Sequence, residues 1–119
     1  MAGSSSAGYT DGLYANFNSP SGLSTDEGGN VFVADFYNNR IRRVDWITHI
    51  VSTVAGRWST YGGPREVDGV GIEAGFSGPC GLTIKDGSIW VTDSVGGTVR
   101  HIGMMYITIQ IYFNKSLIL

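Results

Sequence analysis

The chain reads Phe17-Asn18-Ser19-Pro20-Ser21-Gly22-Leu23, and 59 residues further on it repeats this pattern as Phe76-Ser77-Gly78-Pro79-Cys80-Gly81-Leu82. Two more matches follow at an offset of 58 residues, VFVAD at 31–35 with IWVTD at 89–93, and IRRV at 41–44 with VRHI at 99–102. The matched positions are glycines, turn residues and apolar residues, which a shared backbone requires. The sequence therefore contains one structural unit twice.

Within the first unit, short apolar runs alternate with turn residues. We predict strands over residues 22–25, 31–34, 40–44 and 50–54, with turns at 26–30 and 36–39. Ile41 and Val44 lie three residues apart, so a strand with one buried face cannot bury both, whereas a strand packed between neighbouring sheets can. The prediction is an all-β chain, a partial β-propeller with about two four-stranded antiparallel blades.

The first unit resembles an NHL repeat, through residues 20–23, 31–35 and 38–44, and residues 51–56 resemble the closing strand of that repeat. The second unit is a weaker match because Gly96-Gly97-Thr98 replaces the family's Asn-Arg. The resemblance covers residues 2–102. It implies a β-propeller, usually of six blades, that most often binds proteins or peptides. Some members of the family bind single-stranded RNA, and related propellers include lactonases and a peptide-amidating lyase.

The chain divides into three parts on this pattern. Residues 2–56 form the first NHL-like blade, with its closing strand at 50–56, residues 57–103 form the second, and residues 104–119 are an atypical apolar tail. A repeat array generally needs three or more units to bury its faces. We therefore expect a fragment of a larger propeller, three copies that associate into a ring through open blade edges, or a chain that is only marginally stable alone. The tail alternates well enough to serve as a fourth strand.

Composition narrows the possible partners. The net charge is −2, and nucleic-acid binders usually carry a basic excess, so RNA is a weaker prediction than protein or peptide. The N-terminus has no basic region followed by an apolar run, and the tail is shorter than the roughly 20 residues that a membrane helix needs. We expect neither a signal peptide nor a transmembrane helix. The single cysteine, Cys80, does not indicate a compartment.

Several repeated positions are interpreted as structural. Asp35 and Asp93 end equivalent strands before a turn, where a carboxylate accepts backbone N–H bonds. His49 and His101 lack the spacing of zinc ligands. Trp46 and Trp90 are interpreted as residues that pack within the blades. Thr98 stands in the place of Arg40 in the second unit, so the repeat does not require an Asp35–Arg40 pair. The structural repeat positions are Phe17, Pro20, Gly22, Leu23, Asp35, Phe76, Pro79, Gly81, Leu82 and Asp93.

Binding candidates are aromatic and arginine residues, because interfaces are enriched in Trp, Tyr and Arg. Phe36 and Tyr37 lie in the predicted turn at 36–39, and the connection between the blades supplies Arg57, Trp58, Tyr61 and Arg65. Arg40 and Arg42 come from the predicted strand at 40–44. An alternative interpretation has Trp58 and Tyr61 folding back over a blade rim. The basic cluster at 40–43 could contribute to RNA binding through phosphate contacts.

The functional prediction is a non-catalytic repeat module that binds a protein or peptide, without catalytic residues, metal or cofactor in this chain. One alternative is part of a propeller enzyme of the gluconolactonase or peptide-amidating-lyase kind, with a metal in the central channel. Such an enzyme draws its ligands from several blades. The second alternative is an RNA-binding propeller.

Overall fold

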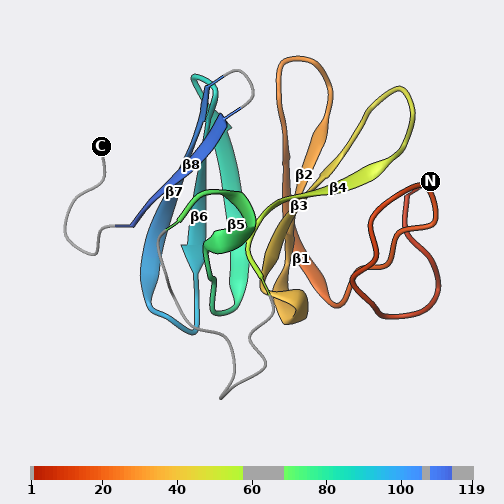
Figure 1. Cartoon of the computed structure of the whole chain (residues 1–119), viewed down its shortest axis with the longest axis horizontal. Coiled ribbons are helices and arrows are strands. Elements are labelled where there is room, and N and C mark those ends of the chain that lie inside the picture. The colour runs from red at the N-terminus through yellow and green to blue at the C-terminus, as the bar shows by residue number, and fades with distance from the viewer. Residues whose placement is uncertain (1, 58–68, 106–107, 114–119) are drawn as a thin grey trace.

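The computed structural model describes residues 2–57, 69–105 and 108–113 and contains two four-stranded antiparallel sheets that lie side by side (Figure 1). The first sheet has the order β1-β2-β3-β4 and the second β5-β6-β7-β8. The strands are β1 (Pro20–Thr25), β2 (Val31–Asp35), β3 (Arg40–Val44), β4 (Val51–Ala55), β5 (Pro79–Lys85), β6 (Ser88–Asp93), β7 (Thr98–Met105) and β8 (Thr108–Phe113). Two 3-10 turns accompany them, η1 (Phe36–Asn38) and η2 (Gly71–Glu73). The predicted partial propeller of about two blades is confirmed.

The two blades share one register. Pro20 pairs with Asp35 and Pro79 with Asp93, and each pairing is followed by an irregularity one residue later. Such an irregularity bends the strand near its first residues. The second unit therefore builds the same sheet although it lacks the family's Asn-Arg, because it keeps the glycine and proline positions that shape the backbone.

The main hydrophobic core lies between the blades. The first blade contributes Phe32, Ala34, Ile41, Val54 and Ala55, and the second Ala74, Phe76, Ile89, Val91 and Ile102, with Leu82 and Ile84 partly buried against them. Ile41 is fully buried in this core. Val44, at the opposite parity of the same strand, points to the other face and is partly buried there. A strand packed on both faces was the prediction from this three-residue spacing.

The inner strands β1 and β5 approach each other closely at Gly22. A Cβ atom at this position would overlap the carbonyl oxygen of Cys80 and lie 3.1 Å from the Cα atom of Gly81. The hydroxyl of Ser21 donates a hydrogen bond to the same Cys80 oxygen, at 3.2 Å. Glycine is thus required at position 22 because the backbone of the next blade occupies the space of a side chain.

A second contact joins the blades at the η1 end of the sheets. The buried side-chain oxygen of Asn39 accepts a hydrogen bond from the Gly78 backbone N–H, at 2.9 Å. Phe36 lies nearby, with its ring edge 3.0 Å from where a Cβ of Gly78 would stand. Asn39 itself adopts the left-handed conformation that closes η1, which asparagine tolerates better than most residues.

The N-terminal segment covers the face of the first blade that points away from the second (Figure 1). Gly12 forms two backbone hydrogen bonds with Val51 of β4, and Ala15 is fully buried. Phe17 lies under the guanidinium of Arg42, with 5.0 Å between the ring centroid and Cζ. Residues without regular secondary structure therefore complete the first blade.

The two tryptophans differ from each other. Trp46 is 64% exposed in the turn between β3 and β4, so the prediction that it packs within a blade is wrong. The turn is fixed instead by Asp45, whose carboxylate accepts the N–H groups of Ile47 and Thr48, and these hydrogen bonds lower the pKa of Asp45. Trp90 is partly buried and packs on the His101 ring, at 4.4 Å between centroids.

No helix within the described residues is long and apolar enough to cross a bilayer.

Candidate functional site

The β2–β3 turn and the end of β4 lie at the same end of the first sheet (Figure 1). In an antiparallel sheet β2 and β4 run in the same direction, so their last residues lie at the same end of the sheet. This places the predicted residues Phe36, Tyr37, Arg40 and Arg57 together at what we call the η1 end of the blades. Trp58, Tyr61 and Arg65 lie outside the described residues.

The two aromatic residues of η1 have different surroundings. Tyr37 is 59% exposed, whereas Phe36 is partly buried against Gly78 of the second blade. The rings meet edge to face, with 5.1 Å between centroids and 81° between planes. Such a pair prefers this geometry because the ring edge is positive and the face negative. Phe36 therefore fixes the position of Tyr37, and Tyr37 is the residue of the pair that a ligand can reach.

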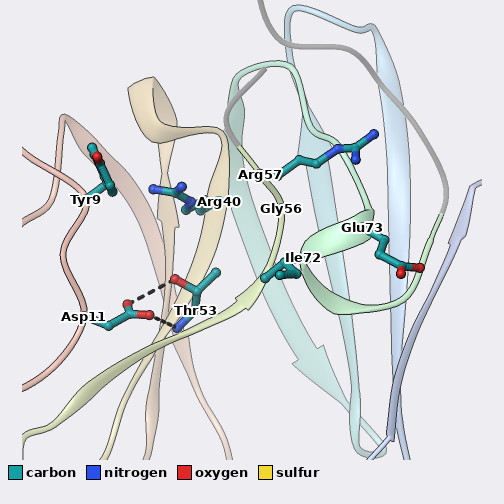
Figure 2. A pocket seen from close by; sticks show the side chains of 8 residues that line it. All are labelled: Tyr9, Asp11, Arg40, Thr53, Gly56, Arg57, Ile72 and Glu73. Carbon is teal, nitrogen blue, oxygen red and sulfur yellow. Dashed lines mark hydrogen bonds between the residues drawn. The ribbon is translucent and has the colours of Figure 1, made fainter. Parts of the chain in front are cut away.

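A groove of about 480 Å³ opens at this end, where the N-terminal segment, β3, β4 and η2 meet (Figure 2). Its lining residues are Tyr9, Asp11, Arg40, Thr53, Gly56, Arg57, Ile72 and Glu73. Only Arg40 and Arg57 of these were predicted. The others come mainly from segments without regular structure, and the sequence gives no sign that residues 9–11 and 72–73 face each other.

The polar groups of the groove fall into two kinds. The Asp11 carboxylate is engaged, because it accepts hydrogen bonds from the N–H and hydroxyl of Thr53, at 3.1 and 3.0 Å, and an ion pair from Arg42. Arg40 lies over the ring of Tyr9, with 4.8 Å between Cζ and the centroid. Figure 2 shows Arg57 extending beyond Gly56, away from Arg40.

Neither Arg40 nor Arg57 forms an ion pair with another residue that the structure describes. Both guanidinium groups are therefore available to a ligand, and each presents planar hydrogen-bond donors. Ile72, which is 66% exposed, adds an apolar wall to the same groove. The groove combines an aromatic ring, two cations and an apolar side chain, which is a surface suited to a peptide segment.

Arg42, predicted as a binding residue, is fully buried. Its guanidinium donates to the carboxylates of Asp35 and Asp11, both at 2.7 Å, and to the backbone oxygens of Thr10 and Asn16. The prediction placed it on a ligand surface, but strand alternation turns it toward the face that the N-terminal segment covers. Arg42 is a structural residue of the first blade.

The second blade repeats this buried pair. Arg100 is also fully buried and lies 3.3 Å from the Asp93 carboxylate, with its Cζ atom 4.7 Å from the centroid of Phe76. Asp35 therefore pairs with Arg42, not with Arg40. The signal was present in the sequence as an aspartate followed seven residues later by an arginine, in both units.

Asp35 and Asp93 also accept backbone hydrogen bonds. Asn18 N–H donates to Asp35 and Ser77 N–H to Asp93, both at 2.8 Å. Each carboxylate thereby ties the segment before the first strand of its blade to the end of the second strand. Across the residues with described positions, no three His, Cys, Asp or Glu side chains are grouped as metal ligands would be.

Two four-stranded blades of one register, packed face to face, define a partial β-propeller. Residues 17–44 match the family model of the NHL repeat, so the first blade contains an NHL repeat.

A chloroplast protein of Arabidopsis thaliana, Protein SUPPRESSOR OF QUENCHING 1, is 31% identical over 100 residues, which are 82% of this chain and 9% of that protein. Two solved structures from Bacteroides thetaiotaomicron are also similar. A protein of unknown function matches with a TM-score of 0.76 and 26% identity, over 94% of this chain and 27% of its own. A putative phosphatase matches with a TM-score of 0.67 and 25% identity, over 96% of this chain and 26% of its own. The chain thus spans about a quarter of each of these structures.

Proposed function

We propose that this chain is a non-catalytic β-propeller repeat module that binds a protein or peptide at the η1 end of its blades. The observation that carries the proposal is the groove, in which Arg40 and Arg57 have no carboxylate partner among the described residues and lie beside Tyr9 and Ile72. Aromatic rings and arginines supply most of the binding energy of protein interfaces, because they bury large areas and keep hydrogen-bonding groups. Tyr37, exposed on the adjacent turn, extends this surface.

We further propose that the module works within a larger propeller, of six blades if it follows the usual form of the family. Two observations support this. Repeat architectures bury their faces only against neighbouring units. The chain also corresponds to about a quarter of each solved structure that it matches.

The burial of Arg42 and Arg100 favours a protein or peptide over RNA. RNA binding needs cationic groups on an accessible surface that can neutralise phosphates. Arg42 of the basic cluster at 40–43 and its equivalent in the second blade, Arg100, are instead paired with buried aspartates. The surface that remains is mixed in charge, since Glu73 lines the same groove as Arg57.

The test uses a displayed library of random peptides, selected against the purified chain. Affinities of the recovered peptides are then measured by fluorescence anisotropy for the parent chain and for two variants, Tyr37→Ala and Arg57→Ala. Matched controls are Tyr14→Ala, 84% exposed in the N-terminal segment, and Lys85→Ala, exposed at the end of β5. We expect each site variant to weaken binding about tenfold or more, as truncated anchors usually do, and the controls to bind as the parent does. Equal affinities for site and control variants would reject the η1 end as the binding surface.

A further inference from the structure

Arg40 and Arg42 both contact the N-terminal segment, but only one of them is neutralised there. Arg42 has two carboxylate partners, Asp35 and Asp11, each at 2.7 Å. Arg40, nearer the η1 end, meets instead the ring of Tyr9, whose centroid lies 4.8 Å from Cζ. An aromatic face attracts a guanidinium group electrostatically but carries no net charge. The Tyr9 ring therefore holds Arg40 in place and leaves its positive charge to a ligand.

Arg57 supplies a second positive charge beside Gly56 (Figure 2). Arg57 is exposed and forms no ion pair with another described residue. Gly56 has a φ of +97°, and a Cβ atom there would overlap the backbone oxygen of Asn39 and lie 2.9 Å from the Cα atom of Arg40. Position 56 thus requires glycine and places no side chain between the two arginines.

The acidic residues of the groove do not offset both arginines. The Asp11 carboxylate is occupied by Arg42 and Thr53. The carboxylate of Glu73 is exposed and points away from Arg40 and Arg57 in Figure 2. Among the described residues, the groove therefore has two free cations and one free carboxylate. This charge distribution favours an anionic ligand.

We propose that the groove binds an acidic peptide segment, with one aspartate or glutamate carboxylate on Arg40, another on Arg57 and an apolar side chain against Ile72. This inference rests on the proposed function and names the chemistry of the peptide. A planar guanidinium group donates two parallel hydrogen bonds to a carboxylate, and the opposite charges strengthen both bonds. The contacts come from the N-terminal segment, β3, the end of β4 and η2, and none of them uses an outer face of a blade.

Two features of the groove favour the carboxylates of a peptide over the phosphates of a nucleic acid. Arg40 covers one face of the Tyr9 ring, so a base cannot stack on that face. Ile72 and Glu73 lie on the other side of β4 from Tyr9 (Figure 2). An apolar side chain and a carboxylate do not bind a continuous phosphate backbone, whereas they suit a peptide in which acidic and apolar residues alternate.

Fluorescence anisotropy with labelled peptides of equal length tests the proposal. One peptide alternates glutamate and leucine, and the others have glutamine or lysine in place of glutamate. We expect the glutamate peptide to bind about tenfold tighter than the glutamine peptide, because its hydrogen bonds to arginine are charge-assisted, and to weaken as salt is added. Glu73→Gln should tighten binding of the glutamate peptide about twofold, since it removes a like charge.

Reversing one charge of the groove gives the decisive comparison. Arg57→Glu should reverse the preference, so that the lysine peptide binds tighter than the glutamate peptide. Lys85→Glu is the matched control, because it changes the net charge equally at an exposed residue at the opposite end of the blades. The control should keep the preference of the parent chain. Circular dichroism checks that both variants are folded.

The outcomes separate this inference from the proposed function. If library peptides bind at the η1 end but the glutamate peptide binds no tighter than the glutamine peptide, the acidic ligand is wrong and the proposed function stands. If no peptide binds, both are wrong. An unchanged preference in Arg57→Glu, or an equal change in Lys85→Glu, would also overturn the inference. So would an oligouridine RNA that binds more tightly than the glutamate peptide and is lost in Arg57→Glu.

Discussion

Replacing Gly22 by alanine is expected to loosen the junction between the blades. The added Cβ would lie less than 3.0 Å from the Cys80 carbonyl oxygen, and ordinary contact begins at 3.4 Å, so β1 and β5 must move apart by at least 0.4 Å. A gap of this order costs about a quarter of the dispersion energy of the atoms along it. The atoms concerned belong to backbone and cannot rotate away.

The size of the effect follows from the core that this movement opens. Its five largest side chains are Phe32, Ile41, Phe76, Ile89 and Ile102. If each contributes about 2 kcal/mol by burial, a quarter of the total is about 2.5 kcal/mol. Strain from overpacking adds about 1 kcal/mol, which gives a loss of about 3.5 kcal/mol in the free energy of unfolding.

Urea denaturation followed by circular dichroism measures this loss, at a chain concentration low enough to exclude association. Gly81→Ala is the control, because among the described residues its Cβ would meet a threonine hydroxyl of the same sheet and no backbone of a neighbouring strand. Its expected cost is about 1 kcal/mol, for turning that side chain. Equal losses for the two substitutions, or a loss below about 1 kcal/mol for Gly22→Ala, would refute the close approach of β1 and β5 as the reason for glycine.

Two further predictions concern ionisable groups, one fully buried and one partly buried. Asp35→Asn removes one charge of a pair whose side chains are both fully buried and 2.7 Å apart, so we expect a loss of about 3 kcal/mol by urea denaturation, whereas Glu27→Gln, at an exposed residue, should change stability by less than about 0.5 kcal/mol. Burial lowers the pKa of His101 below its ordinary value of 6.5, so the folded state favours the neutral ring. The stability that the neutral ring contributes should therefore be lost as the pH falls from 6.5 through the pKa of the folded state. Denaturation at a series of pH values should show this slope for the parent chain and a reduced slope for His101→Gln; an unchanged slope would contradict the assignment.

The strands and turns of both blades follow from local chemistry in the sequence. Glycine and proline at 20–22 and 79–81 shape the inner strands, and asparagine at 39 closes the turn after β2. These positions matter for the backbone, so the second blade forms although its side chains have diverged. The strand ends differ from the predicted ones by one or two residues, for example at β1, which begins at Pro20 and not at 22.

The candidate site was less accessible to prediction because it depends on how separate segments meet. Arginine is usually a surface residue. Arg42 is structural because the N-terminal segment supplies Asp11 and covers the face of the first blade on which Arg42 lies. Tyr9 and Ile72 are turn or loop residues that line the groove from either side of β4. No pattern in the sequence around either residue indicates that the two lie in one groove. Trp46 was misplaced because an aromatic residue after a strand looks apolar in the sequence, whereas the turn fixed by Asp45 carries it into solvent.

Native-state amide hydrogen exchange tests most directly whether two equivalent sheets form one cooperative unit. The amides of β2 and β6, the second strand of each blade, should be among the slowest to exchange and should share one opening free energy, since the common core joins them. Gly22→Ala should lower that free energy equally for both strands. Rapid exchange of one blade while the other stays protected, or a loss confined to the first blade, would contradict a shared core between them.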